Sequence, residues 1–224
     1  IMYFFFYYEP YIALLGHLNT DEDYETAQKA LKSINKKYQK ELVQSCTLVQ
    51  KNEFHGLLRQ GSVLMNLIQD FEEAVCPSGI RWGIGIGKSS PEKQPASSWE
   101  ARSAAFQNAQ DAWKFLREQN NRNASFTTDY YMVCSGDHEE VTHLINTIFM
   151  LITSLKKGWT RHQREVITDY MKYGGGQAKA AKRLGITQSS VQKSLAGGSY
   201  YTYQEVMDTL NEIFSQIGER KEYI

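Results

Sequence analysis

The residues of this chain with the clearest chemical potential lie near its carboxyl end, on a segment with regularly spaced polar groups. Val191 and Leu195 are spaced as the buried side of a helix, so the positions around them face outward. Amide and hydroxyl side chains can read base edges in the DNA major groove, and cations can contact phosphates. We therefore predict DNA binding by this segment. The predicted contact residues are Lys182, Arg183, Thr187, Gln188, Ser189, Gln192 and Lys193.

Two short helices and the turn between them must position these groups. Ala181 is small enough to allow helices to approach closely, and Gly185, four residues later, supplies the positive φ needed where a helix ends. Thr187 is a good N-cap for the next helix, and Val191 follows Gly185 by six residues as a β-branched core residue. The spacing predicts a helix-turn-helix. The alternative is a helical hairpin that contacts protein.

Further helices flank this motif. Thr160 and Gln163 form the pattern of a capping box, which predicts a helix from there to about Tyr173. A long, largely apolar helix is expected over 137–157 and an amphipathic one over 202–217. We expect the last helix to pack on the helix-turn-helix or to form a dimer seam. The long helix is a second candidate for holding a homodimer together.

The charge of the chain is distributed unevenly. Lys and Arg together number 25, as do Asp and Glu, so the formal net charge is zero. Residues 156–200 nevertheless contain nine cations and two anions, a net charge of +7, and the rest of the chain carries −7. A neutral total therefore hides a basic block on an acidic body, and the block coincides with the predicted helix-turn-helix.

Composition narrows the class of protein. Hydrophobic residues make up 42% of the chain and aromatic residues 12%, which is too much for a disordered protein. Three widely spaced cysteines without a C-x-x-C pair indicate a reducing compartment and neither a disulfide framework nor a zinc site. The aromatic extension over 1–10 is too short to span a bilayer and has no features of a signal peptide. We expect a cytoplasmic protein with no membrane partner.

Residues 11–136 alternate strand and helix patterns in the order βαββαβ, a loop, then αβ. The clearest strand is 80–87, where Ile80, Trp82, Ile84 and Ile86 point to one face and glycines dominate the other. Glycine weakens a strand, so this face is expected to admit a helix, a second backbone or a ligand at close range. The predicted fold class is α+β: an antiparallel sheet followed by an all-α domain.

Four segments, in this order, carry a family resemblance: YIALLGHL, QKNEFHGLL, IRWGIGIG and ARSAAFQNAQDA, followed by the helix-turn-helix. With them the chain resembles the SatD family. The resemblance implies a ferredoxin-like palm similar to that of class III nucleotide cyclases and GGDEF-type enzymes. In such palms carboxylates after the first strand and on the following hairpin hold two divalent cations against a nucleoside triphosphate.

The sequence departs from that pattern at its metal-binding positions. His17 stands at the first aspartate position, and Lys51-Asn52-Glu53 replaces Gly-Asp-Glu, so only Glu53 keeps its carboxylate. Mg²⁺ prefers carboxylate oxygens, so we expect neither a bound metal nor catalytic residues. The surviving shape could still hold a nucleotide, and the alternative is that these side chains are core or surface residues. The candidate pocket consists of His17, Lys51, Asn52, Glu53, Arg81, Gly85 and Arg102.

These observations predict a regulator rather than an enzyme. The expected domains are an aromatic extension (1–10), a cyclase-like palm (11–136), a connecting helix (137–157) and a helix-turn-helix domain (158–224). The palm would sense a nucleotide effector or hold a homodimer together, and the partner would be double-stranded DNA. Two alternatives stay open: a nucleotide-binding protein or residual metal-dependent nucleotidyltransferase or cyclase, and a protein-interaction adaptor.

Overall fold

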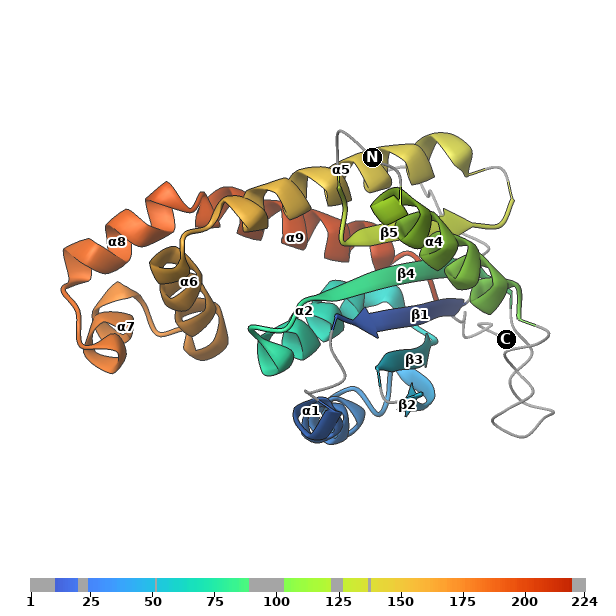
Figure 1. Ribbon diagram of the computed structural model, residues 1–224, viewed down its shortest axis with the longest axis horizontal. Coiled ribbons are helices and arrows are strands. Elements are labelled where there is room, and N and C mark those ends of the chain that lie inside the picture. The colour runs from blue at the N-terminus through green and yellow to red at the C-terminus, as the bar shows by residue number, and fades with distance from the viewer. Residues whose placement is uncertain are drawn as a thin grey trace, which may run out of the picture. The chain divides into compact units, whose positions relative to one another are not determined.

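Local signals in the sequence produce a mixed α and β fold with a five-stranded sheet and a helical carboxyl-terminal part (Figure 1). The computed structural model describes residues 11–19, 24–50, 52–88, 103–121, 127–136 and 138–218. The amino-terminal extension lies outside these ranges. The elements are β1 (Tyr11–Leu18), α1 (Tyr24–Lys37), β2 (Leu42–Val49), β3 (Glu53–Leu58), the 3-10 turn η1 (Gly61–Val63), α2 (Leu64–Val75), β4 (Ile80–Gly87), α4 (Ala104–Asn121), β5 (Tyr130–Cys134), α5 (Glu139–Gly158), α6 (Arg161–Tyr173), α7 (Gln177–Leu184), α8 (Gln188–Gly197) and α9 (Tyr200–Phe214).

The chain forms two compact units. One consists of residues 151–209 and the other of the residues before and after that range. From the sequence we expected a domain boundary near Gly158. In the structure the first unit ends inside α5 at Met150, and it also includes the residues from Leu210 onward. In the first unit, the amide of Gly61 donates to the carbonyl of Ile217 at 2.9 Å, which ties the end of the chain to η1. Among the described residues, no helix has the length and apolar character needed to cross a membrane.

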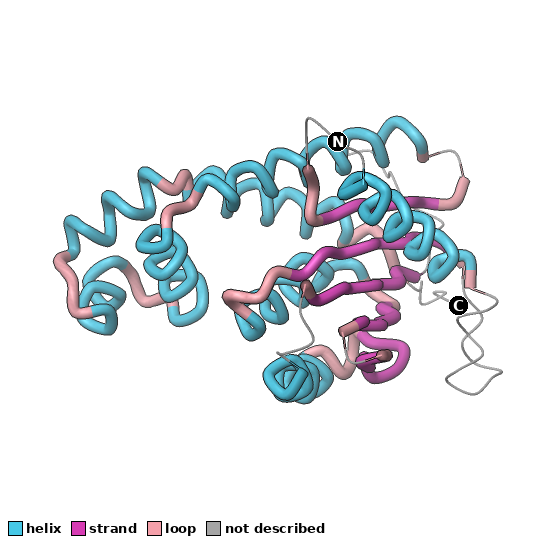
Figure 2. The backbone as a smooth tube through the Cα atoms, in the orientation of Figure 1, coloured by secondary structure: helices cyan, strands magenta, loops and turns pink. Residues whose placement is uncertain are grey.

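The sheet has the strand order β2-β3-β1-β4-β5 (Figure 2). The pairs β2–β3, β3–β1 and β1–β4 are antiparallel, as predicted, and the register places His17 of β1 opposite both Glu53 of β3 and Arg81 of β4. The prediction of an antiparallel sheet is wrong at one edge, where β5 runs parallel to β4. The reason is the connection: α4 crosses over between these strands and returns the chain in the same direction, as in a βαβ unit.

One face of the sheet is covered by α2 and carries the aromatic core of the first unit. Trp82 and Phe54 from the sheet and Phe71 from α2 are fully buried and pack edge to face, with ring centroids 5.0–5.8 Å apart. Each such ring pair adds about 0.5–1.5 kcal/mol beyond the burial of apolar area. The Trp82 Nε1–H also donates to Glu72 of α2 at 3.2 Å, so its one polar group is satisfied.

The opposite face is covered by α4, and the glycines of β4 make this possible. A Cβ on Gly85 would lie 1.9 Å from the carbonyl oxygen of Ala105 and 2.2 Å from the amide nitrogen of Ala109. Gly83 meets the same helix, since a Cβ there would lie 2.6 Å from the Ala109 carbonyl oxygen. Of the three explanations that the sequence left open for this glycine face, a closely packed helix is the one observed.

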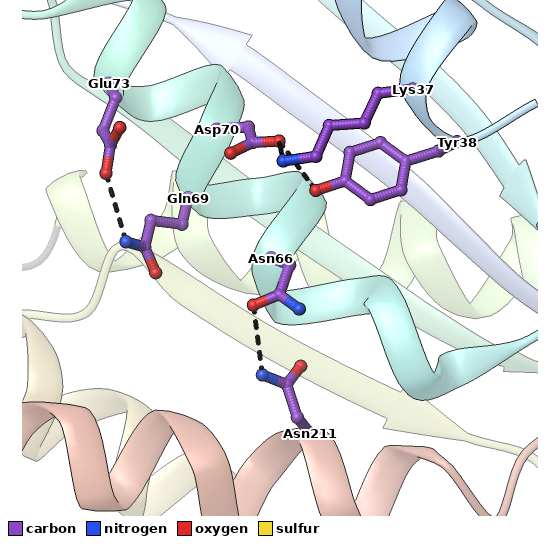
Figure 3. Close-up of polar contacts among 7 residues, drawn as sticks. All are labelled: Lys37, Tyr38, Asn66, Gln69, Asp70, Glu73 and Asn211. Carbon is purple, nitrogen blue, oxygen red and sulfur yellow. Dashed lines mark hydrogen bonds and ion pairs between the residues drawn. The ribbon is translucent and has the colours of Figure 1, made fainter. Parts of the chain in front are cut away.

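Polar contacts join α1 and α9 to α2 in the first unit (Figure 3). The carboxylate of Asp70 accepts hydrogen bonds from the Tyr38 hydroxyl at 2.7 Å and from the Lys37 ammonium. Burial, followed by this bond to Asp70, raises the pKa of Tyr38 well above its usual value, so the phenol remains a donor at all ordinary pH values. Asn211 of α9 donates to Asn66 at 3.3 Å.

The second unit is built around α6, α7 and α8. The predicted capping box is present: the Thr160 hydroxyl accepts from the Gln163 amide at 3.2 Å, and the Gln163 side chain accepts from the Thr160 amide at 2.9 Å. The side chains buried between the three helices are Val166, Ile167, Ala180, Ala181, Val191 and Leu195. Trp159 closes one end of this core by donating from Nε1 to the Gly198 carbonyl at 2.7 Å.

Candidate functional site

The turn between α7 and α8 is three residues long and held by its own hydrogen bonds. Gly185 ends α7 in the left-handed conformation, with φ 66° and ψ 28°, and its amide donates to the Ala181 carbonyl. Thr187 is the N-cap of α8, and its hydroxyl accepts from the Ser190 amide at 3.1 Å. Both local predictions, the positive φ and the cap, are confirmed. The turn therefore fixes the direction in which α8 leaves α7.

The outward side of α8 carries the predicted polar groups. Val191 and Leu195 are fully buried, whereas the remaining predicted positions on this helix are exposed: Gln188, Ser189, Gln192 and Lys193. Lys182 is likewise exposed on α7. A row of amide and hydroxyl groups on a helix between two lysines has the donors and acceptors that base edges and phosphates require.

The sequence around this row carries positive charges and no negative ones. From Tyr170 to Gln204 the sequence contains five Lys or Arg residues and no Asp or Glu. Lys172, Lys179, Lys182 and Lys193 are all exposed. A surface segment with cations and no counter-charge of its own attracts a polyanion over a distance of about one Debye length, roughly 8 Å at physiological salt.

Arg183 occupies a different environment from its neighbours. Its guanidinium forms a bidentate ion pair with Asp169 of α6, with Nε 3.1 Å from Oδ1 and Nη2 2.6 Å from Oδ2. Nη2 also donates to the carbonyl of Gly174, just after the end of α6, and the group lies over the ring of Tyr173. The hydrogen bonds to Asp169 raise the pKa of Arg183 above its ordinary value. This side chain clamps α6 to α7.

A second group of candidate residues lies on the sheet face that α4 covers. The register brings His17, Glu53 and Arg81 side by side on three adjacent strands. Trp113 of α4 stacks on the His17 imidazole with a centroid separation of 3.7 Å, and the Arg81 guanidinium lies over the same indole at 5.0 Å. The indole therefore contacts both an imidazole and a cation.

His17 is held in its neutral form. Its Nε2 is buried, has no hydrogen-bond partner among the described residues and lies 3.7 Å from Glu53 Oε2, beyond hydrogen-bonding distance. Burial is the largest effect and lowers the pKa of His17 below 6.5; Glu53 opposes this shift, while Arg81 and His55 add to it. Glu53 instead bonds to His55, at 2.5 Å from Nε2 to Oε1.

Sequence reasoning missed two members of this cluster. His55 follows Glu53 by two residues, so strand periodicity alone places both side chains on one face and could have identified it. Trp113 lies 60 residues from Glu53 in the sequence, and only the packing of α4 on the sheet brings it there. The indole is thus a feature that no local pattern could reveal.

The other predicted pocket residues are not gathered around His17. Asn52 contributes its backbone carbonyl, which accepts from the Leu18 amide at 2.9 Å, and Gly85 lies directly beneath α4. Lys51 and Arg102 lie outside the described residues. Within the described ranges, no three or more His, Cys, Asp or Glu side chains are grouped so that they could hold a metal ion.

Comparison with known proteins gives one family. The family model described as "SatD family" matches residues 11–213. No curated protein matches the chain. One matching solved structure is described as a regulator of polyketide synthase expression from Bifidobacterium adolescentis; it is 12% identical, covers 92% of this chain and 84% of its own, and superposes with a TM-score of 0.30. A likeness at this level does not establish a shared fold.

Proposed function

We propose that this chain, which belongs to the SatD family, binds double-stranded DNA through α7 and α8 and acts as a transcription regulator. The observation that carries the proposal is the exposed polar row of α8, set in a segment with five cations and no anions. In helix-turn-helix proteins the second helix of the pair enters the major groove, and residues near its amino terminus contact base edges. The short, capped turn before α8 suits that role.

The side chains divide into three roles under this proposal. Gln188 and Gln192 read bases, because a carboxamide can donate to and accept from adenine at once. Lys182 and Lys193 contact phosphates, which sets affinity and register but not sequence preference. Arg183 positions α7 through Asp169 and does not contact DNA, a revision of the role we predicted for it from sequence.

The sheet unit acts in this proposal as a degenerate palm with a sensory or oligomerising role. Two features support this role. The antiparallel strands β2-β3-β1-β4, connected in the order βαββ and then αβ, have the connectivity of a ferredoxin-like sheet. His17 and Asn52, neither of them anionic, stand where the resemblance to such palms implies aspartates.

Salt-dependent binding to duplex DNA tests the proposal. Fluorescence anisotropy with a mixed-sequence 30-base-pair duplex should give a log K that falls linearly with log salt. Lys182→Ala and Lys193→Ala should each reduce the magnitude of the slope by about 0.9, the contribution of one phosphate contact. Lys36→Ala, an exposed lysine of α1, is the matched control and should leave the slope unchanged. A slope near zero, or equal effects of all three substitutions, would contradict the assignment.

Sequence preference tests the reading role of α8 separately. Rounds of selection from a random duplex library should enrich one motif with the native chain. Gln188→Ala and Gln192→Ala should relax the preference at one or two positions, with a loss of about 1–3 kcal/mol for the preferred base. Their effect on the salt slope should be small. Enrichment of the same motif by both variants would show that α8 does not read it.

A second candidate function is nucleotide binding at the sheet, favoured by the buried Nε2 of His17, which has no hydrogen-bond partner in the described part of the chain. Calorimetric titration with ATP and GTP, with and without Mg²⁺, tests it. Heat that disappears in His17→Gln while duplex binding persists would support an effector site. If Mg²⁺-dependent turnover accompanied binding, the residual nucleotidyltransferase alternative would gain support instead. Absence of binding to either nucleotide would leave the sheet unit without this function.

A further inference from the structure

Helix α5 has a row of apolar side chains that does not belong to its buried face. Leu144 and Leu151 are 61% and 65% exposed, the highest values for large apolar residues on this helix. Half-buried apolar residues continue the row on either side and between them, and the full set is Val141, Leu144, Ile148, Leu151 and Leu155. The intervals along the sequence are three, four, three and four residues.

This alternation of three and four is the a/d pattern of a coiled-coil seam over two heptads. The side of α5 that packs inside the chain is different and includes Ile145, Phe149 and Ile152, all buried. At 100° per residue the two rows lie about 90° apart around the helix. Because α5 is one uninterrupted helix from Glu139 to Gly158, this spacing follows from helix geometry alone.

We propose that this row, the α5 stripe, pairs with the α5 stripe of a second copy of the chain in an antiparallel two-helix seam. The opposite charges at the two ends of the helix favour a second copy of α5 as the partner and an antiparallel orientation. The first turn carries Glu139 and Glu140, and the last turn carries Lys156 and Lys157. A two-fold axis across the middle of the stripe sets the acidic end of each copy beside the basic end of the other.

The parallel alternative lacks this complementarity, because it would bring acidic end to acidic end and basic end to basic end. It would also align the two helix dipoles, whereas the antiparallel arrangement opposes them. The antiparallel seam has a defined register: Leu144 packs against Leu155 of the second copy, and Ile148 packs against Leu151 of the second copy. The two-fold axis then lies between residues 149 and 150.

The proposal does not rest on DNA binding, but it has a consequence for it. A symmetric dimer supplies two copies of α8, and two-fold helix-turn-helix proteins bind paired half-sites. A dimer that bound no DNA would leave the seam intact as an inference and would count only against the proposed function.

Molar mass in solution tests the seam. Light scattering on the full chain at high micromolar concentration should give twice the 25.7 kDa of one chain. Leu144→Glu and Leu151→Glu change exposed positions and should each weaken association more than about tenfold, because each places a charge in an apolar seam. His143→Glu, an exposed neighbour outside the stripe, is the matched control and should associate as the native chain does. Far-ultraviolet circular dichroism checks that each variant is folded.

Cysteine cross-linking tests the orientation. In a chain with Cys76→Ser and Cys134→Ser, the pair Leu144→Cys and Leu155→Cys should give a covalent dimer on mild oxidation, whereas Leu144→Cys alone should not. In a parallel seam the single substitution would cross-link by itself. A monomeric native chain, a dimer indifferent to Leu144→Glu and Leu151→Glu, or a cross-link through Leu144→Cys alone would each overturn the proposal.

Discussion

Replacing Gly85 with alanine should destabilise the sheet unit more than any other single-methyl addition on β4. An ideal Cβ there lies 1.9 Å from the Ala105 carbonyl oxygen and 2.2 Å from the Ala109 amide nitrogen. Both are backbone atoms of α4, so no side-chain rotation can relieve the contact. To restore even 3.0 Å, α4 must retreat from the sheet by about 1 Å.

The expected loss of unfolding free energy follows from the packing between α4 and the sheet that this movement disrupts. Ala105 and Ala109 are fully buried against the sheet, so moving α4 opens a gap along a tightly packed face. Overpacking of this kind costs about 1–3 kcal/mol and occasionally more. The lower entropy of an unfolded chain with Ala instead of Gly returns about 0.4–1 kcal/mol. Because the contacts are with backbone atoms, the upper end of the overpacking range applies, and we expect a net loss of about 2 kcal/mol. For a unit of this size that is roughly 4–8 °C in melting temperature.

A series of glycine substitutions makes the test sharper than one variant could. Gly83→Ala meets the Ala109 carbonyl oxygen at 2.6 Å, and Gly87→Ala meets the Ser135 hydroxyl at 2.9 Å. The first contact is again backbone, whereas the second is a side chain that can rotate away. Gly158→Ala has no atom within 4 Å and serves as the control. The expected order of destabilisation is Gly85, Gly83, Gly87, Gly158.

Urea denaturation followed by circular dichroism and tryptophan fluorescence measures this order. A Gly85→Ala chain within about 0.5 kcal/mol of the native chain would refute the reasoning, as would a larger effect at Gly87 than at Gly85. The first result would mean that the glycine face is not closed by α4. The glycine face of β4 would then have space for a ligand.

Three further substitutions test separate contacts. The buried side chain of Asn146 accepts a hydrogen bond from the amide of Met132 and donates one to its carbonyl. Asn146→Ala leaves both backbone groups without this partner, so it should lower the free energy of unfolding, measured by urea denaturation, by about 2–4 kcal/mol. Thr160→Ala removes the capping box of α6 and should cost about 1 kcal/mol, seen as a lower helix melting temperature with Thr160→Ser close to the native value. The pKa of His17 in the folded chain lies below 6.5, so the unfolded chain binds the proton more readily. The free energy of unfolding should therefore fall as the pH decreases from about 7 through 6.5 towards the folded-state pKa. His17→Gln should give a flatter profile over that range, and an equally steep one would contradict the assignment.

Features governed by neighbours in the sequence could be predicted from the sequence. The two faces of β4 follow from alternation, the capping box from the spacing of Thr160 and Gln163, and the turn before α8 from Gly185 and Thr187. Each depends on hydrogen bonds or side-chain directions within about four residues. For the same reason the exposed row of α8 could be anticipated, since a helix with a known buried side has a known outward side.

Features that depend on distant segments appeared only in the tertiary structure. The parallel edge strand β5 follows from the path of α4, and the closure of the glycine face follows from its packing. The same packing brings Trp113 onto His17 and turns a predicted pocket residue into a stacked, neutral imidazole. Likewise Arg183 could be recognised as a cation, but its pairing with Asp169 of α6 depends on the packing of α6 against α7.

The sequence by itself thus determined the order of the elements, the amphipathic faces and the location of the basic block, because composition, periodicity and capping are local. Only the tertiary structure decided which charges are already paired and which faces are already covered. The physical reason is that a side chain's partner is selected by packing across the chain. The +7 block of residues 156–200 is therefore not nine equivalent cations: Arg183 holds the fold, while Lys182 and Lys193 stand exposed beside the row on α8.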